Sequence, residues 1–355
     1  MKKIISLVLV LGLTVSLVGC NETKKESLYS CDTLNVFSWG EYIDEETLRM
    51  FEDENNVRVN YSLFDSNESM YTQLLGGNDY DVLVPSDYMI ERLIEEDLVQ
   101  KLDLSLIKNF GNIADGVKNV PFDPNNEYSI PFFWGSVGIV YDHTVIDPKK
   151  VEELGYDIFL DEGLKGQAFF YDSERDSFMT ALKALGYSMN TEDEKEIEEA
   201  YQWLLKVDKV IDPAYVTDEV IDGMIYGEKL IANVYSGDAA YALSENSNLS
   251  YHEPLKGTNK WIDSMVITKN SKCTDLAHAY LDFMLSEEAS TMNSEYVGYT
   301  GNTNQAIKAL SDEGGYYHGN NAYLARSEYE HDESFKHNEV LKQKLADLWI
   351  KVKNS

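Results

Sequence analysis

The sequence predicts an α/β protein built from two units. Short apolar runs alternate with amphipathic helical patterns along the 355 residues, which is typical of mainly parallel sheets whose strands are connected by helices. Two extended runs, 128–141 and 260–268, are placed where the chain would cross from one unit to the other and back. About 320 residues follow the N-terminal segment, which is enough for two domains of ordinary size.

The first third of the chain supplies three strands and three helices. Residues 82–84 are continuously apolar, as expected of a central strand in a parallel sheet, and Pro85 ends the run. Ser86 or Asp87 then caps a helix. The strands are expected at 34–39, 57–62 and 80–85, and the helices at 45–55, at 68–75 and from 86 onward.

The middle of the chain predicts the first crossing. Residues 102–118 are rich in loop formers, and 121–126 carry dense turn chemistry. The extended run 128–141 that follows is too long for one ordinary strand and is broken by glycines, so we expect it to pass between the two units. A fresh alternation then gives strands at 167–171, 230–235 and 260–268, and helices at 177–185, 192–207, 239–244, 274–285 and 332–353.

The N-terminus has the features of a bacterial secretion signal. Two lysines precede an apolar run, 4–18, that is too short to span a bilayer. Cys20 follows in an arrangement that looks like a lipobox, in which residues 1–19 are removed and the Cys20 thiol is lipidated. The alternative is an ordinary signal peptide with a chance cysteine. We expect a signal peptide at 1–19, a polar lipid-anchored tether at 20–32, and an extracytoplasmic or periplasmic protein attached to the cell membrane.

Charge and cysteine content narrow the classes of partner. Thirty Lys and Arg against 62 Asp and Glu give a net charge of −32, which repels nucleic acid and attracts cations, although an acidic surface often serves solubility alone. Cys31 and Cys273 are far apart and in no metal-like spacing, so they form either a disulfide or two buried thiols. The six histidines show no ligand spacing either, and we expect no metal and no cofactor.

Aromatic residues recur beside carboxylates. On an extended strand, residues two apart point from the same face, so Trp261 and Asp263 would act together. An aromatic face attracts an organic cation and covers its methylenes, while a carboxylate accepts its N–H groups. The alternative for each pair is an aromatic in the core and an acid on the surface. The groupings are Trp39 with Glu41 and Tyr42, Tyr235 with Asp238, Trp261 with Asp263, and Tyr329 with Glu330.

Seven stretches in order give the chain a resemblance to a known family. From about Leu34 to the C-terminus it resembles the spermidine/putrescine-binding proteins of ABC-type polyamine importers. That resemblance implies two lobes, 33–138 with 264–308 and 139–263 with 309–355, which are joined by crossing strands and close around the ligand in a hinged cleft. It also implies a monomer that passes a polyamine to permease subunits and is not an enzyme. The stretches are FSWGEY (37–42), SNESMY (66–71), YDVLVPSDY (80–88), PFDPNN (121–126), YSIPFFWG (128–135), WIDS (261–264) and VGY (297–299).

The resemblance also implies a set of ligand contacts. Trp261 and Asp263 correspond to the main cation site, where the indole packs on methylenes and the carboxylate binds an amine. Asp176 corresponds to a carboxylate that holds a terminal amine. Relatives often carry a polar amide where this chain has Glu330. The other matched positions are Trp39, Glu41 and Tyr42 in a first contact loop, Ser86 and Tyr88 in a second, and Tyr299 in the wall of the cleft.

Several departures bear on specificity. Ser173 stands where spermidine-binding relatives have an aspartate, and Asp172 is the adjacent carboxylate that could replace it. Tyr235 stands where a tryptophan is common. Asp238 lies near Tyr235, at a position where putrescine-preferring relatives are also acidic. The sequence therefore mixes features of both preferences and leaves the choice of polyamine open.

Two other classes of function stay open. A glycoside hydrolase also places carboxylates beside aromatic rings, yet no nucleophile elbow, phosphate loop or metal-ligand spacing supports catalysis. A clamp for another cationic or neutral solute is the second alternative. Anionic solutes would need Arg or Lys in the cleft, and the matched positions offer neither.

Overall fold

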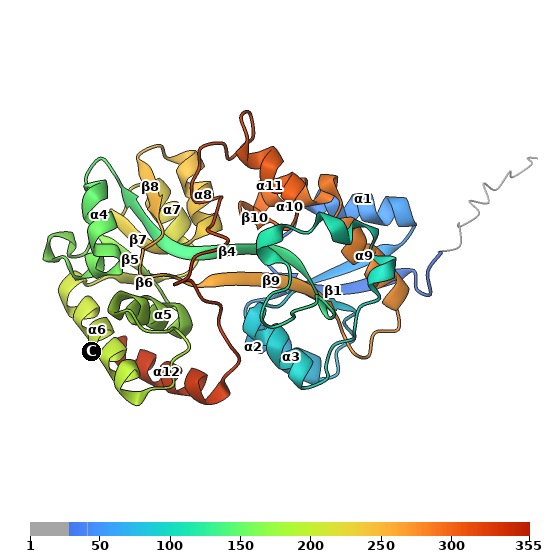
Figure 1. Cartoon of the computed structure of the whole chain (residues 1–355), viewed down its shortest axis with the longest axis horizontal. Helices are drawn as coiled ribbons and strands as arrows, with labels where there is room; N and C mark the ends of the chain where they lie inside the picture. The colour runs from blue at the N-terminus through green and yellow to red at the C-terminus, as the bar shows by residue number, and fades with distance from the viewer. Residues whose placement is uncertain (1–27, 41) are drawn as a thin grey trace, which may run out of the picture.

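The computed structural model describes residues 28–40 and 42–355, which form two α/β lobes side by side (Figure 1). Paired strands run through both lobes in the order β2-β1-β3-β9-β4-β7-β5-β6, and β8 and β10 also pair with β4. Within the described part, no helix is long and apolar enough to cross a membrane. The signal peptide 1–19 and Cys20 lie outside the described residues.

The first lobe contains the N-terminal strands. β1 pairs in parallel with β2 and β3, and β3 pairs with the antiparallel β9. Three short 3₁₀ helices lie between α3 and β4. The elements are β1 (Thr33–Trp39), α1 (Glu45–Asn55), β2 (Arg58–Phe64), α2 (Asn67–Leu75), β3 (Val82–Leu83), α3 (Asp87–Glu95), η1 (Leu104–Leu106), η2 (Lys108–Asn112), η3 (Asp115–Val117), β9 (Lys260–Ile267), α9 (Thr274–Met284), α10 (Glu287–Val297), β10 (Thr300–Gly301) and α11 (Asn304–Ser311).

The second lobe is built around β5, which pairs in parallel with β6 and β7. Helix α12, at the C-terminal end of the chain, packs against α5 and α6 of this lobe. The elements are α4 (Pro148–Leu154), η4 (Gly155–Leu160), η5 (Glu162–Leu164), β5 (Ala168–Tyr171), α5 (Glu174–Leu185), α6 (Glu194–Ile211), β6 (Ala214–Val216), α7 (Glu219–Ile225), β7 (Ile231–Tyr235), α8 (Ser236–Glu245), β8 (Leu249–His252) and α12 (Glu339–Val352).

Strand β4 (Ser129–Asp142) joins the two lobes, and Figure 1 shows it running from one into the other. Its first half pairs with β9, from Ser129 opposite Val266 to Ser136 opposite Lys260, and its second half pairs with β7 and β8. The predicted crossing is therefore confirmed. Because β4 and β9 are antiparallel to their neighbours, the sheet is mixed, whereas the alternation of strands and helices predicted mainly parallel pairing.

The hydrophobic core is divided between the lobes. Clusters that include Phe51 with Tyr280 and Phe37 with Met70 fill the first lobe, on the two faces of its sheet. Others, such as the one that contains Phe159, fill the second. Each lobe therefore has its own core, and the strands that connect them can act as a hinge.

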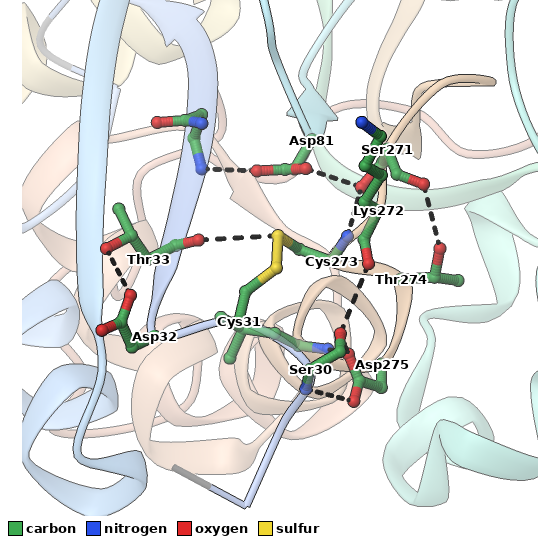
Figure 2. Close-up of a disulfide and its surroundings, with 12 residues drawn as sticks. Ser30, Cys31, Asp32, Thr33, Asp81, Ser271, Lys272, Cys273, Thr274 and Asp275 are labelled. Carbon is green, nitrogen blue, oxygen red and sulfur yellow. Dashed lines mark hydrogen bonds between the residues drawn. A yellow bond between two sulfur atoms is a disulfide. The ribbon is translucent and has the colours of Figure 1, made fainter. Parts of the chain in front are cut away.

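Cys31 and Cys273 form a disulfide, with their Cα atoms 5.4 Å apart (Figure 2). It ties the segment before β1 to the start of α9, next to a second link in which the backbone N–H and hydroxyl of Ser30 donate to Asp275. Of the two possibilities left open by the sequence, the disulfide is the one present. It lies just before the first residue of β1, at the end of that strand opposite to Trp39.

Candidate functional site

The candidate site lies where strand ends of both lobes meet beside the crossing strands. Trp39 ends β1 and Ser86 follows β3 in the first lobe, while Ser173 follows β5 and Tyr235 ends β7 in the second. Strand β9 passes beside them, antiparallel to β3. In open α/β sheets, ligands bind at the carboxyl ends of parallel strands, so the topology alone marks this region.

Asp263 on β9 is the carboxylate of the first lobe. Its side chain is buried and accepts a hydrogen bond of 2.5 Å from the Tyr42 hydroxyl, and Ser86 is a second donor. Burial raises the pKa of Asp263 to about 6, and the two hydroxyls oppose that rise. The carboxylate is thus held in place by short polar contacts within an apolar environment.

Asp176, in the first turn of α5, is a buried carboxylate of the second lobe. Its Oδ2 accepts hydrogen bonds from Ser173 at 2.8 Å and from the Tyr235 hydroxyl at 2.7 Å. Ser173 is also the N-cap of α5, where its hydroxyl accepts from the Asp176 N–H. The Oδ1 of Asp176 is buried without a hydrogen-bond partner, and burial raises the pKa of this carboxyl. One acceptor atom is therefore left for a ligand.

Asp238, in the first turn of α8, brings the two lobes into contact. It accepts from Tyr171 of the second lobe at 2.9 Å and from Tyr299 of the first lobe at 2.9 Å. Burial raises the pKa of Asp238 to about 6. A carboxylate has about four acceptor positions, so two hydrogen bonds leave it able to bind a further donor.

Aromatic rings separate these three carboxylates. The Trp261 indole is 8% exposed and packs edge-on against Tyr299 at 4.9 Å and Tyr235 at 6.1 Å between ring centroids. Two glycines make the packing possible: a Cβ at Gly135 would lie 2.6 Å from the Trp261 ring, and one at Gly237 would lie 1.5 Å from the Tyr299 ring. The arrangement offers ring faces for methylenes and carboxylates for N–H groups.

Most of the residues predicted from the sequence are brought together here. Tyr88 contributes a hydroxyl that accepts from Asn67 at 3.0 Å. Trp39 packs on Phe64 with ring centroids 4.5 Å apart, and its indole N–H is buried without a partner. With Trp39, the predicted residues that the structure places in or beside the cluster are Tyr42, Ser86, Tyr88, Ser173, Asp176, Tyr235, Asp238, Trp261, Asp263 and Tyr299.

Two predicted residues lie elsewhere, and one is not described. Asp172 turns away and accepts from Trp349 at 3.1 Å and from Lys353, because adjacent residues of an extended segment point in opposite directions. The Glu330 side chain is 82% exposed and lies 3.5 Å from the His331 ring. Glu41 lies outside the described residues.

Three residues of the region were not predicted as site residues. Tyr171 is the last residue of β5, just as Tyr235 is the last residue of β7, and the two rings are in contact. Its position at the end of a predicted strand could have identified Tyr171 as a site residue. Asp87 was considered only as a helix cap, yet the residue is 1% exposed, one carboxyl oxygen has no hydrogen-bond partner, and burial raises its pKa well above the ordinary value. The Arg175 guanidinium lies 3.8 Å from the centre of the Tyr88 ring, in a cleft where the matched positions indicated no cation.

The described residues contain no group of three or more His, Cys, Asp or Glu that could hold a metal ion. The chemistry of the cluster is instead that of three aspartates, the six hydroxyl groups that donate to them and an indole, gathered from both lobes. Such a set can bind ammonium groups and cover the carbon chain between them.

Comparisons with known proteins point to one family. A family model described as bacterial extracellular solute-binding protein matches residues 46–314. The spermidine/putrescine-binding periplasmic protein of Escherichia coli K12 is 35% identical over 284 residues, covering 79% of this chain and 81% of the relative. A putrescine/cadaverine-binding protein of Pseudomonas aeruginosa is 30% identical over 309 residues, covering 84% of this chain and 85% of the relative.

Solved structures give the same result. The crystal structure of the spermidine/putrescine ABC transporter substrate-binding protein PotD from Streptococcus pneumoniae, in complex with calcium and HEPES, is 37% identical with a TM-score of 0.79. The solved structure of a putative spermidine/putrescine ABC transporter from Listeria monocytogenes is 33% identical with a TM-score of 0.80. Each comparison covers 91% of this chain and 99% of the other.

Proposed function

The chain belongs to the bacterial extracellular solute-binding protein family, and we propose that its solute is a polyamine, spermidine or putrescine, which it delivers to an ABC permease. The observation that carries this proposal is the set of three aspartates, Asp176, Asp238 and Asp263, gathered from both lobes around the Trp261 indole. The names of the relatives at 30% identity and above agree with it.

The physical argument is one of charge. Three carboxylates in a cleft that closes over them lose hydration, which is costly unless a cation replaces the water. The raised pKa values of Asp238 and Asp263 reflect that cost in the structure. A diamine or triamine offers two or three ammonium groups joined by methylenes, and Trp261, Tyr235 and Tyr299 present ring surface to such a chain.

The alternatives are weaker. Family membership assigns the chain to solute-binding proteins, so the glycoside hydrolase considered from the sequence is not supported. Another cationic solute would satisfy the carboxylates, but a neutral solute would leave their charges unpaired. We therefore place polyamine first and another cation second.

The proposed ligand contacts follow from where the side chains lie. Trp39, Ser86 and Tyr88 supply one side, and Ser173 and Tyr235 supply the other. We keep Glu41 among the contacts on the resemblance alone. Asp172 and Glu330 are left out because their side chains contact residues outside the cluster.

Anchoring belongs to the same proposal. A lipid on Cys20 and a tether at 20–32 would hold the protein as a monomer at the outer side of the cell membrane, with lobes of 33–138 plus 264–308 and 139–263 plus 309–355. The first described residues attach through the disulfide to the end of the first lobe, away from the cleft, so a tether there would leave the lobes free to move. A Cys20→Ser variant released from the membrane fraction would support the anchor, and one retained there would contradict it.

The first prediction tests the function. Isothermal titration of the mature chain with spermidine and with putrescine should give one site, and the affinity should fall as salt rises because the contacts are ionic. Asp263→Asn should weaken binding by about 3–5 kcal/mol, since an ammonium would lose a buried charged partner.

The matched control is Glu330→Gln, which removes one negative charge from an exposed position. It should bind as the wild type does. The proposal fails if no polyamine at millimolar concentration gives heat or a shift in melting temperature, or if Asp263→Asn binds as tightly as Glu330→Gln.

A further inference from the structure

A groove opens between the lobes, outside the aspartate cluster. Its walls come from α7 and α8 of the second lobe, from α10 of the first, and from the segment that follows α11. It encloses about 660 Å³, within the range of small-molecule sites. Because its two sides belong to different lobes, they converge only when the lobes approach each other.

Exposed tyrosines line the groove. Tyr241 on α8, Tyr296 on α10 and Tyr316 after α11 are 43%, 61% and 55% exposed. Exposed aromatic rings are costly in water, and three that face one hollow are a surface suited to an organic ligand. The face of a tyrosine ring attracts organic cations such as alkylammonium and guanidinium groups.

The charge of the groove is negative throughout. Asp44, Glu295 and Asp238 lie along it, and none of the described residues that line it is Lys or Arg. Asp238 is also part of the aspartate cluster, through its hydrogen bonds from Tyr171 and Tyr299. One carboxylate therefore belongs both to the groove and to the inner site.

We propose that this groove holds the outer ammonium groups of polyamines longer than spermidine, so that the chain accepts a tetra-amine whose inner part lies among the aspartates and whose outer end lies between Tyr241 and Tyr296. This inference rests on the proposed function and extends it from short to long polyamines. A permease loop could also contact this face, but the shared Asp238 favours a single molecule that occupies both sites.

The second prediction uses spermine and putrescine as probes. The double variant Glu295→Gln/Tyr296→Ala should weaken spermine binding roughly fivefold, because an exposed ion pair and an exposed ring contact are lost. Putrescine is too short to reach the groove from the inner site and should change by less than about twofold. Tyr296→Phe should keep spermine affinity, since the ring face remains.

The matched control is Glu288→Gln, which removes the same charge from the same helix at an exposed residue outside the groove. It should leave both affinities unchanged. The inference is overturned if the double variant weakens both ligands equally, if it leaves spermine unaffected, or if wild type binds putrescine but not spermine. Failure of every polyamine to bind wild type would instead remove the proposed function itself.

Discussion

At the residue scale, each aspartate of the cleft is held by tyrosine hydroxyls. A phenol that donates to a carboxylate supports the ionised form, while burial supports the neutral form. For Asp238 and Asp263 burial is the larger effect, and their pKa values rise to about 6. Asp218 adds a like charge near Asp238 that raises its pKa further, and Asp263 raises the pKa of the neighbouring Asp87 in the same way. Binding should therefore respond to pH.

The third prediction follows from these pKa values. Polyamine amines stay protonated near neutrality, so affinity depends on the carboxylates, and lowering the pH from about 7.5 to about 5 should weaken binding about tenfold for each protonated aspartate. The ligand-free protein should respond in the opposite sense. A folded pKa of about 6 against 3.8 means that the folded state binds more protons between these values, so stability should rise as pH falls through that window.

Isothermal titration of spermidine at the two pH values checks that affinity falls with pH. The melting temperature of the ligand-free protein, measured at the same pH values, checks that stability rises. Affinity that is the same at both pH values would mean that the carboxylates stay ionised in the cleft. The Asp238→Asn variant should lose its own share of the pH dependence and retain the part that belongs to Asp263 and Asp176.

At the element scale, local sequence patterns predicted the helices and strands well, but they predicted poorly the direction in which the strands pair. The length of 128–141 was enough to predict the crossing strand β4, but the direction of its neighbours depends on contacts far along the chain. The last helix was expected from 332 and begins at Glu339, because Glu333 pairs beside Asn259 instead of continuing a helix. Helices α10 and α11 were missed although Ser286 and Thr303 supply their N-cap hydrogen bonds, which was a usable signal.

The disulfide is an element-scale feature that the sequence left open, since spacing alone does not bring two cysteines together. It closes a loop with a sequence separation of 242 residues. Cross-linking residues that far apart restricts the unfolded chain more than the folded one. It should therefore stabilise the first lobe without shaping the cleft.

The fourth prediction concerns that bond. Replacing both cysteines by serine should lower the free energy of unfolding by about 2–4 kcal/mol, measured by urea denaturation. Spermidine affinity at low denaturant should change little, because the bond lies at the end of β1 opposite to Trp39. A double variant as stable as wild type, or one that folds but no longer binds, would contradict this account.

At the scale of the whole molecule, the site exists because the lobes are closed. The sequence identified Asp238 and Tyr299 separately, through short motifs, but their hydrogen bond joins different lobes and depends on closure. Arg175 on Tyr88 is a second contact of this kind. No local sequence pattern says which residues of the two lobes come into contact when the lobes close. The site residues were therefore predictable, but their hydrogen-bond and ring-contact partners in the other lobe were not.

The C-terminal helix α12 forms two ion pairs with the first lobe, which we call the α12 latch. Lys342 of α12, in the second lobe, forms an ion pair of 2.7 Å with Glu68 at the start of α2 in the first. Glu339 of the same helix pairs with Arg92 of α3 at 3.4 Å. The Lys342 side chain is only 18% exposed, so this pair is less screened than an ordinary surface pair.

The fifth prediction separates this latch from the rest of α12. Lys342→Met keeps most of the packing of the side chain but removes the ion pair, which should shift the protein toward the open form and weaken spermidine binding by up to about fivefold. Lys344→Met is the matched control, because Lys344 pairs with Glu194 of α6 within the second lobe. Small-angle scattering of the ligand-free variants should give a larger radius of gyration for Lys342→Met alone. Equal scattering and equal affinity for the two variants would mean that closure does not depend on α12, and that the hinge strands and the cleft contacts set the equilibrium by themselves.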